Sequence, residues 1–270
     1  MSATVAALDG WDCHVHVFDA LAPAAAGHYQ PAARGLLEIE AIAAAHGVAH
    51  LVLVQPSVYG SDNSVLLKGL RSRSGQHRGV VVVDATVSDR ELDAMHEAGV
   101  RGVRFNLVSP VGQRGWPAAA LKVLQPKLKR LGWHVQWYAQ PADLHAIAHW
   151  HARSGIACVL DHLGGLRADV AGEDPAWHAL AQLAAGGAWI KLSGWYRLGA
   201  PAPYAELDGV IARVAQLFNR HLLWGSDWPH TFFVDQPMPN YETLWHRLPL
   251  LLGAETAKSA RCQWPACLYS

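Results

Sequence analysis

The feature that most constrains the fold is a series of eight short apolar segments, each followed by enough residues for a helix. The segments are rich in valine, leucine and aromatic residues, and many are apolar throughout, as expected of strands buried on both faces. Strands that alternate with helices in this way predict a parallel sheet covered by helices. The predicted strands are residues 12–18, 51–55, 80–85, 102–106, 134–138, 158–162, 189–193 and 222–226.

Helix boundary signals lie between the predicted strands. Ser88 is expected to cap a helix, with Glu91 as its capping-box partner and Gly99 as its end. Two further helices are expected over residues 141–155, which begin with proline and end with glycine, and over residues 204–219, which carry a helical apolar stripe.

Eight strand–helix units predict an α/β fold of the (β/α)8 TIM-barrel type, and we expect one domain over residues 1–270. The alternative is a doubly wound open sheet. The first predicted strand is not followed by the glycine-rich GxGxxG turn that would favour this alternative.

The balance of charge narrows the class of function. Lysine plus arginine equals aspartate plus glutamate at 22 each, so no basic excess favours nucleic acid. No apolar run approaches the roughly 18 residues of a membrane span. Four cysteines without a CxxC pair, and an N-terminus unlike a signal peptide, favour the reducing cytoplasm. We expect a cytoplasmic protein with a small-molecule partner, as a monomer or a homodimer.

Polar residues accumulate where the predicted strands end. In a TIM barrel the carboxyl ends of the strands form the face that carries the chemistry, whereas the barrel interior is filled by apolar side chains. Charged and imidazole groups that meet there lose hydration, and this loss costs free energy unless the groups pair with one another or take part in a reaction. The polar residues at these positions are His14, His16, Gln55, Ser57, Arg104, Asn106, Gln136, Tyr138, Asp161, His162, Lys191, Ser193, Arg197, Ser226 and Asp227.

Four of these residues form the candidate catalytic set, namely His14, His16, His162 and Asp227. Two histidines at i and i+2 of a strand point to the same side. Three imidazoles and a carboxylate suit either carbonyl polarisation or a Zn²⁺ shell, and packing is the alternative for any single histidine. Arg104 and Arg197 carry guanidinium groups that suit a substrate carboxylate, and a salt bridge to Asp161 or Asp84 is their structural alternative.

Several motifs together resemble one known family. The segments "DCHVHVFD", "GVRFN", "DHLG", "KLSGWYR" and "LLWGSDWPH" occur in this order, and "LVLVQPSVYGSDN" follows the first of them. The chain therefore resembles the amidohydrolase-related (amidohydrolase 2) branch of the amidohydrolase superfamily, most closely the 2-pyrone-4,6-dicarboxylate lactonase group. The resemblance spans nearly the whole chain and implies the same (β/α)8 barrel.

The resemblance implies a lactonase that acts by water attack, with Asp227 as general base and His14, His16 and His162 as catalytic partners. It assigns substrate binding to Arg104, Tyr138, Arg197 and Tyr29, and we expect Gln55 and Ser57 to join them. The substrate is expected to be an anionic lactone from aromatic or sugar acid catabolism: a carboxylated pyrone, a muconolactone or a sugar lactone.

One residue departs from the pattern of the lactonase group. Gly165 stands where the lactonase group has an arginine that clamps a carboxylate, with Arg167 as a nearby substitute.

The resemblance leaves the need for a metal ion open. The lactonase group implies no obligatory metal. Other relatives bind one divalent ion, here Zn²⁺ or Mn²⁺ on His14, His16, His162 and Asp227. A metal-dependent non-oxidative decarboxylase is therefore the alternative function.

Overall fold

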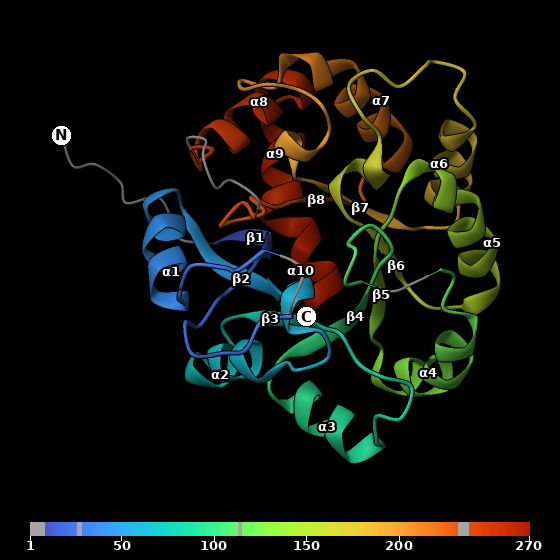
Figure 1. Cartoon of the computed structure of the whole chain (residues 1–270). Helices are drawn as coiled ribbons and strands as arrows, with labels where there is room; N and C mark the ends of the chain where they lie inside the picture. The colour runs from blue at the N-terminus through green and yellow to red at the C-terminus, as the bar shows by residue number, and fades with distance from the viewer. Residues whose placement is uncertain (1–8, 26–28, 113–114, 232–237) are drawn as a thin grey trace.

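The computed structural model describes residues 9–25, 29–112, 115–231 and 238–270. Its centre is one sheet of eight parallel strands, hydrogen-bonded in chain order from β1 to β8, with helices around it (Figure 1). The strands are β1 (Gly10–Val15), β2 (Val48–Val54), β3 (Arg78–Val81), β4 (Val100–Asn106), β5 (His134–Tyr138), β6 (Cys158–Leu160), β7 (Trp189–Leu192) and β8 (Leu222–Trp224).

The sheet closes through the residues that follow β8. His16 N donates to Trp228 O over 2.8 Å, and Asp227 N donates to His14 O over 2.8 Å. Val15 also forms a parallel bridge with Trp228. The predicted (β/α)8 TIM barrel is confirmed, and its closure fixes the end of β1 beside the segment that carries Asp227.

Several strands end earlier than the sequence predicted. β6 stops at Leu160 and β8 at Trp224, two residues short of the polar ends expected at His162 and Ser226. The backbone of His162 (φ 49°) and of Asp227 (φ 61°) is left-handed, which ends the extended conformation. His162 and Asp227 therefore leave from turns at the barrel rim, whereas His14 lies within β1.

The helices follow the predicted signals. Ser88 Oγ accepts from Glu91 N at the start of α3, and the Glu91 carboxylate accepts from Ser88 N, which confirms the capping box. The helix expected over 204–219 begins only at Asp208, because Tyr204 is left-handed (φ 66°). The helices are α1 (Leu36–Ala45), α2 (Ser64–Ser72), α3 (Asp89–Glu97), α4 (Ala118–Leu131), α5 (Leu144–Ser154), α6 (Pro175–Ala185), α7 (Asp208–Phe218), α8 (Thr243–Leu252), α9 (Ala254–Arg261) and α10 (Gln263–Tyr269).

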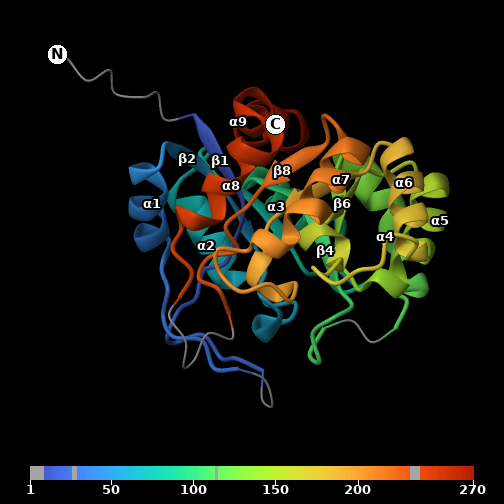
Figure 2. The same cartoon turned by 90° about the horizontal axis from the view of Figure 1, so that it is seen from above.

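The two ends of the barrel differ. At the amino ends of the strands, buried Tyr269 stacks on Trp11 and packs against His134, while Arg78 Nε donates to Tyr269 O over 2.7 Å. The described parts of the loops after β1 and β8 extend from the opposite end, away from α9 and the C-terminus (Figure 2). The C-terminal tail thus closes one end and leaves the other for a site. Within the described part of the chain, no helix is long and apolar enough to cross a membrane.

Candidate active site

A cavity with about 140 Å³ open to water-sized molecules lies at the carboxyl ends of the strands. Eight residues predicted for catalysis or substrate binding line it, contributed by the ends of β1, β2, β4, β5, β6, β7 and β8 and by the loop after β1. The cavity-lining residues are His16, Tyr29, Ser57, Arg104, Asn106, Val108, Ser109, Pro110, Tyr138, His162, Arg197, Asp227 and Thr231.

Asp227 is the centre of this site and is fully buried. Its Oδ2 accepts from Arg197 Nε and from Tyr196 OH, each over 2.6 Å. Burial disfavours the charged carboxylate, but the Arg197 guanidinium and nearby histidines outweigh it and hold the pKa of Asp227 well below its usual range. Asp227 is therefore an anion at neutral pH, with one oxygen firmly bonded.

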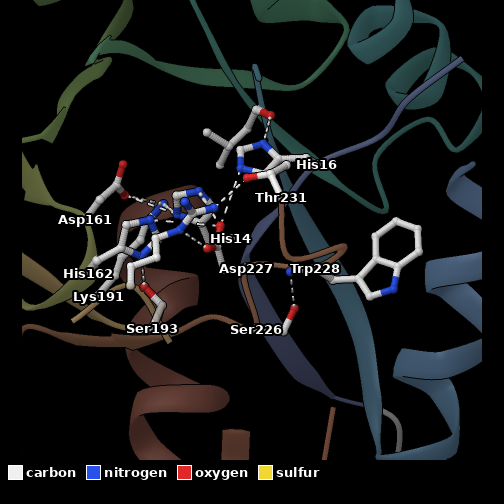
Figure 3. A network of polar contacts seen from close by, with 12 residues as sticks. His14, His16, Asp161, His162, Lys191, Ser193, Ser226, Asp227, Trp228 and Thr231 are labelled. Atoms are coloured by element: carbon white, nitrogen blue, oxygen red, sulfur yellow. Dashed lines mark hydrogen bonds and ion pairs between the residues drawn. The ribbon is translucent and has the colours of Figure 1, made fainter. Parts of the chain in front are cut away.

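The other carboxylate oxygen of Asp227 faces three imidazoles (Figure 3). Asp227 Oδ1 lies 3.6 Å from His14 Nε2, 3.5 Å from His16 Nε2 and 3.9 Å from His162 Nε2. It has no hydrogen-bond partner among the described residues, and neither has His14 Nε2. The structure thus brings the four residues of the predicted catalytic set together around one oxygen atom.

Contacts on the far side of each ring orient the histidines. His16 Nδ1 lies 2.7 Å from Val54 O, which only accepts, so Nδ1 carries a proton. His162 Nδ1 lies 2.9 Å from Ser193 Oγ. Burial lowers the pKa of His162 to about 4 and that of His14 well below its usual range.

A buried polar network lies beneath the cavity, centred on Asp161. Its Oδ1 is 3.2 Å from His14 Nδ1 and 3.4 Å from Lys191 Nζ, and its Oδ2 accepts from Arg104 Nε over 3.0 Å and from Gln136 Nε2 over 3.1 Å. Burial raises the pKa of Asp161, but His14, Lys191 and Arg104 outweigh it, so this pKa lies well below its usual range. Arg104 therefore pairs with Asp161, the structural alternative expected for it, and also lines the cavity.

Two glycines make room for these side chains. A Cβ on Gly194, where φ is +65°, would lie 2.4 Å from His162 Nδ1, and a Cβ on Gly225 would lie 2.7 Å from His14 Cβ. Any larger residue would displace the imidazole. The glycines of "KLSGWYR" and "LLWGSDWPH" are thus explained by the close approach of the two histidines.

Two predicted residues do not line the cavity. His14 is fully buried beneath it and reaches it through Asp227. Gln55 is also fully buried: its Nε2 donates to Gly60 O and Asp62 O and holds the loop after β2, beside a neighbouring cavity.

The position of the missing arginine clamp has no room for a side chain. Gly165 has φ +79°, and a Cβ there would lie 2.5 Å from Ala139 O. Arg167 is outside the cavity lining, mostly exposed at 56% and paired with an aspartate.

Sequence reasoning gave no role to several residues that the structure brings into the site. Tyr196 bonds Asp227, and Thr231 accepts from Arg197 Nη2 over 2.6 Å. Asp161 and Gln136 were visible as polar residues in apolar strands, which is a usable signal. Thr231 had none, because it lies in an irregular segment after β8.

Two groups of described residues could hold a metal ion: His14 with His16 and Asp227, and His14 with Asp161 and His162. The possible ligand atoms of each group lie within 4.8 Å of one another. His14 belongs to both groups, but its Nδ1 faces Asp161 and its Nε2 faces Asp227.

Comparisons with known proteins identify a matching family and several similar proteins. The family model described as amidohydrolase matches residues 11–256. The chain is 32% identical to a 2-pyrone-4,6-dicarboxylate hydrolase of Comamonas testosteroni, over 85% of this chain and 79% of the relative. It is 27% identical to a 4-sulfomuconolactone hydrolase of Rhizobium radiobacter, over 83% of this chain and 77% of the relative. A solved Pseudomonas putida structure, provisionally assigned as a 2-pyrone-4,6-dicarboxylic acid hydrolase, superposes with a TM-score of 0.87, at 29% identity and 97% coverage of both chains.

Proposed function

The chain belongs to the amidohydrolase family, and on this premise we propose that it is a hydrolase that opens a lactone ring with water. The observation that carries the proposal is Asp227 Oδ1, a buried carboxylate oxygen of a cavity-lining residue that has no hydrogen-bond partner among the described residues. The relatives named as pyrone dicarboxylate and sulfomuconolactone hydrolases support the substrate class.

In the proposed reaction, Asp227 Oδ1 takes a proton from water as the water oxygen attacks the lactone carbonyl carbon. Arg197 and Tyr196 hold Oδ2, so the carboxylate cannot rotate away from the attacking water. The ring C–O bond then breaks, and the alkoxide takes up the proton. The products are one carboxylic acid and one hydroxyl group.

His16 and His162 line the cavity beside Asp227, and in the proposed reaction they face the carbonyl oxygen of the lactone. Orienting fixed dipoles toward developing negative charge is a large source of rate enhancement in acyl transfer. His14, which is buried beneath, keeps Asp227 Oδ1 in place rather than touching the substrate. Tyr138 and Tyr29 complete the wall that receives the ring.

The residues present also fit one divalent ion. His14 Nε2 and Asp227 Oδ1 are buried atoms without hydrogen-bond partners in the described residues, and His16 Nε2 lies 3.5 Å from that carboxylate oxygen. An ion such as Zn²⁺ or Mn²⁺ on His14, His16, His162 and Asp227 would polarise the lactone carbonyl when bound. Because Arg197 already compensates the charge of Asp227, we propose that the ion is not obligatory.

A second candidate function follows from the same cluster. Three imidazole nitrogens close to one carboxylate oxygen also favour a metal-dependent, non-oxidative decarboxylase. This reaction needs the ion, whereas the proposed lactonase does not, so the two differ in their response to metal removal.

The test is proton release, followed with a pH indicator, from carboxylated pyrones, muconolactones and sugar lactones with chelator-treated enzyme. Turnover of a lactone supports the hydrolase without an obligatory ion. Turnover recovered only after Zn²⁺ or Mn²⁺ is added supports a hydrolase that depends on the metal site. No lactone turnover in either state, together with CO₂ release from an acid in the metal-loaded enzyme, contradicts the lactonase and supports the decarboxylase.

A further inference from the structure

The end of β4 forms the cavity wall across from the proposed base. In a closed ring of eight strands in chain order, β4 lies opposite β8, after which Asp227 follows. Arg104 and Asn106, two residues apart on β4, both line the cavity. The reacting carbonyl and a distant substituent of the same ring can therefore contact the two sides at once.

The orientation of the Asn106 amide follows from its neighbours. Asn106 Oδ1 accepts from Val108 N over 3.1 Å and from Ser109 N over 2.9 Å. Backbone N–H groups only donate, so the atom that they contact is the amide oxygen. The Nδ2 group is then the one left for other contacts, and it has no hydrogen-bond partner among the residues that the structure describes.

The neighbouring guanidinium is oriented in a similar way. Arg104 Nε is bonded to Asp161 Oδ2, and the guanidinium lies 5.2 Å from the centre of the Tyr138 ring, which also lines the cavity. A guanidinium and an amide N–H group on one wall are donors suited to the oxygens of a carboxylate.

The sum of the charges around the site is balanced by one substrate anion. The side chains of the connected network that form ion pairs are the cations Arg104, Lys191 and Arg197 and the carboxylates Asp161 and Asp227. Three cations and two carboxylates leave one unit of positive charge in a buried region. A second negative group on the substrate would be without a matching cation, which is costly away from water.

The adjoining cavity supplies no cation for a second anionic group. It has about 280 Å³ open to water-sized molecules, shares Ser57, Arg104 and Asn106 with the first cavity, and is lined further by Asp84. Arg104 is its only cation among the described lining residues, and the Asp84 carboxylate would repel an anion.

Arg104 is already expected to bind the substrate. We propose that Asn106 adds an amide donor beside it in a subsite for one substrate carboxylate, and that the substrate is a lactone with a single acidic group. This inference rests on the proposed lactone hydrolysis and narrows its substrate. Asn106 is then a specificity-determining residue, whose amide N–H donates to the carboxylate beside the guanidinium of Arg104.

The first part of the test compares matched lactones on the wild-type protein. We expect kcat/KM for 2-pyrone-6-carboxylate to exceed that for uncharged 2-pyrone and for 2-pyrone-4,6-dicarboxylate by at least about 10-fold, the effect of roughly 1.4 kcal/mol of binding. A dicarboxylate that is hydrolysed as well as the monocarboxylate contradicts the subsite but leaves the hydrolase standing. Absence of turnover with every lactone contradicts the hydrolase itself and the subsite with it.

The second part uses two substitutions that keep the turn after β4. Asn106→Asp retains an oxygen that accepts from Val108 N and Ser109 N but replaces the amide donor with negative charge. Asn106→Ser retains an acceptor without added charge. We expect KM for the monocarboxylate to rise about 30-fold or more in the first variant and about 5-fold in the second, with KM for uncharged lactones nearly unchanged.

Asn240→Asp is the matched control. Asn240 Oδ1 accepts from Glu242 N in the same kind of turn, but on the exposed surface outside the cavity. We expect this variant to match wild type. If Asn106→Ser binds the monocarboxylate as wild type does, the amide N–H does not contact the substrate and the assignment of Asn106 is wrong.

Discussion

Arg197 Nε and Asp227 Oδ2 lie 2.6 Å apart, so the arginine expected to bind the substrate is already paired with the carboxylate expected to act as base. The same guanidinium donates to Thr231 through Nη2. Arg197 is therefore held in place by two contacts, and we propose that it orients Asp227.

Replacing Arg197 with glutamine should reduce turnover of anionic and uncharged lactones alike. Without the guanidinium, Asp227 keeps only Tyr196 as a donor to Oδ2 and loses its fixed orientation. We expect kcat to fall about 100-fold for both kinds of lactone, as for the loss of one oriented polar group. Steady-state kinetics on a matched pair of lactones measures this. A rise in KM for the anionic lactone alone, with kcat intact, would return Arg197 to a purely substrate-binding role.

Replacing Asp227 with asparagine removes the proposed base and keeps the shape of the side chain. We expect kcat to fall by a factor of about 10² to 10⁴, the usual contribution of general base catalysis, with the substrate still bound. Single-turnover kinetics together with substrate binding by calorimetry separates the two effects. Unchanged turnover in a folded variant would contradict the proposed mechanism.

The Asp161 network predicts unequal costs for its members. Asp161→Asn leaves both Lys191 and Arg104 without their buried carboxylate, and we expect about 3–5 kcal/mol of lost stability. Lys191→Met should cost less, because Arg104 and Asp161 still pair. The double variant should lose less than the sum of the two single variants, since the residues are in contact. Urea unfolding at pH 7 tests this, and strict additivity would show that the Lys191–Asp161 contact contributes nothing.

His134, at the closed end of the barrel, predicts a dependence of stability on pH. Burial lowers its pKa from 6.5 to about 3, so the unfolded chain takes up a proton near pH 6.5 that the folded chain takes up only near pH 3. Acidification between these values therefore favours unfolding. We expect His134→Leu to reduce the stability lost between pH 7 and pH 4.5 by about 2.5 kcal/mol, from 1.36 kcal/mol per pKa unit.

The control for this prediction is His149→Leu, which alters an exposed histidine on α5. Thermal or urea unfolding at the two pH values gives the comparison. If both variants show the same pH dependence as wild type, the burial of His134 does not contribute to the acid sensitivity of the fold.

The sequence by itself determined the order of the elements and the barrel. Ser88 and Glu91 lie three residues apart and form their capping box locally, and the apolar runs become the eight strands in chain order. Such signals are short-range, because a strand or a helix cap depends on residues within a few positions of one another. The family motifs likewise indicated which side chains gather at the carboxyl ends of the strands.

Only the tertiary structure decided which groups pair. His14 and His16 look alike in the sequence, yet His16 lines the cavity and His14 lies beneath it against Asp161, 147 positions further along the chain. Whether Arg197 faces solvent, substrate or Asp227 depends on how the loops after β7 and β8 leave the closed barrel, including the left-handed backbone at Asp227. Spacing along the chain cannot supply these contacts, because they depend on strand register, on closure between β1 and the residues after β8, and on the few ångströms of space left by Gly194 and Gly225.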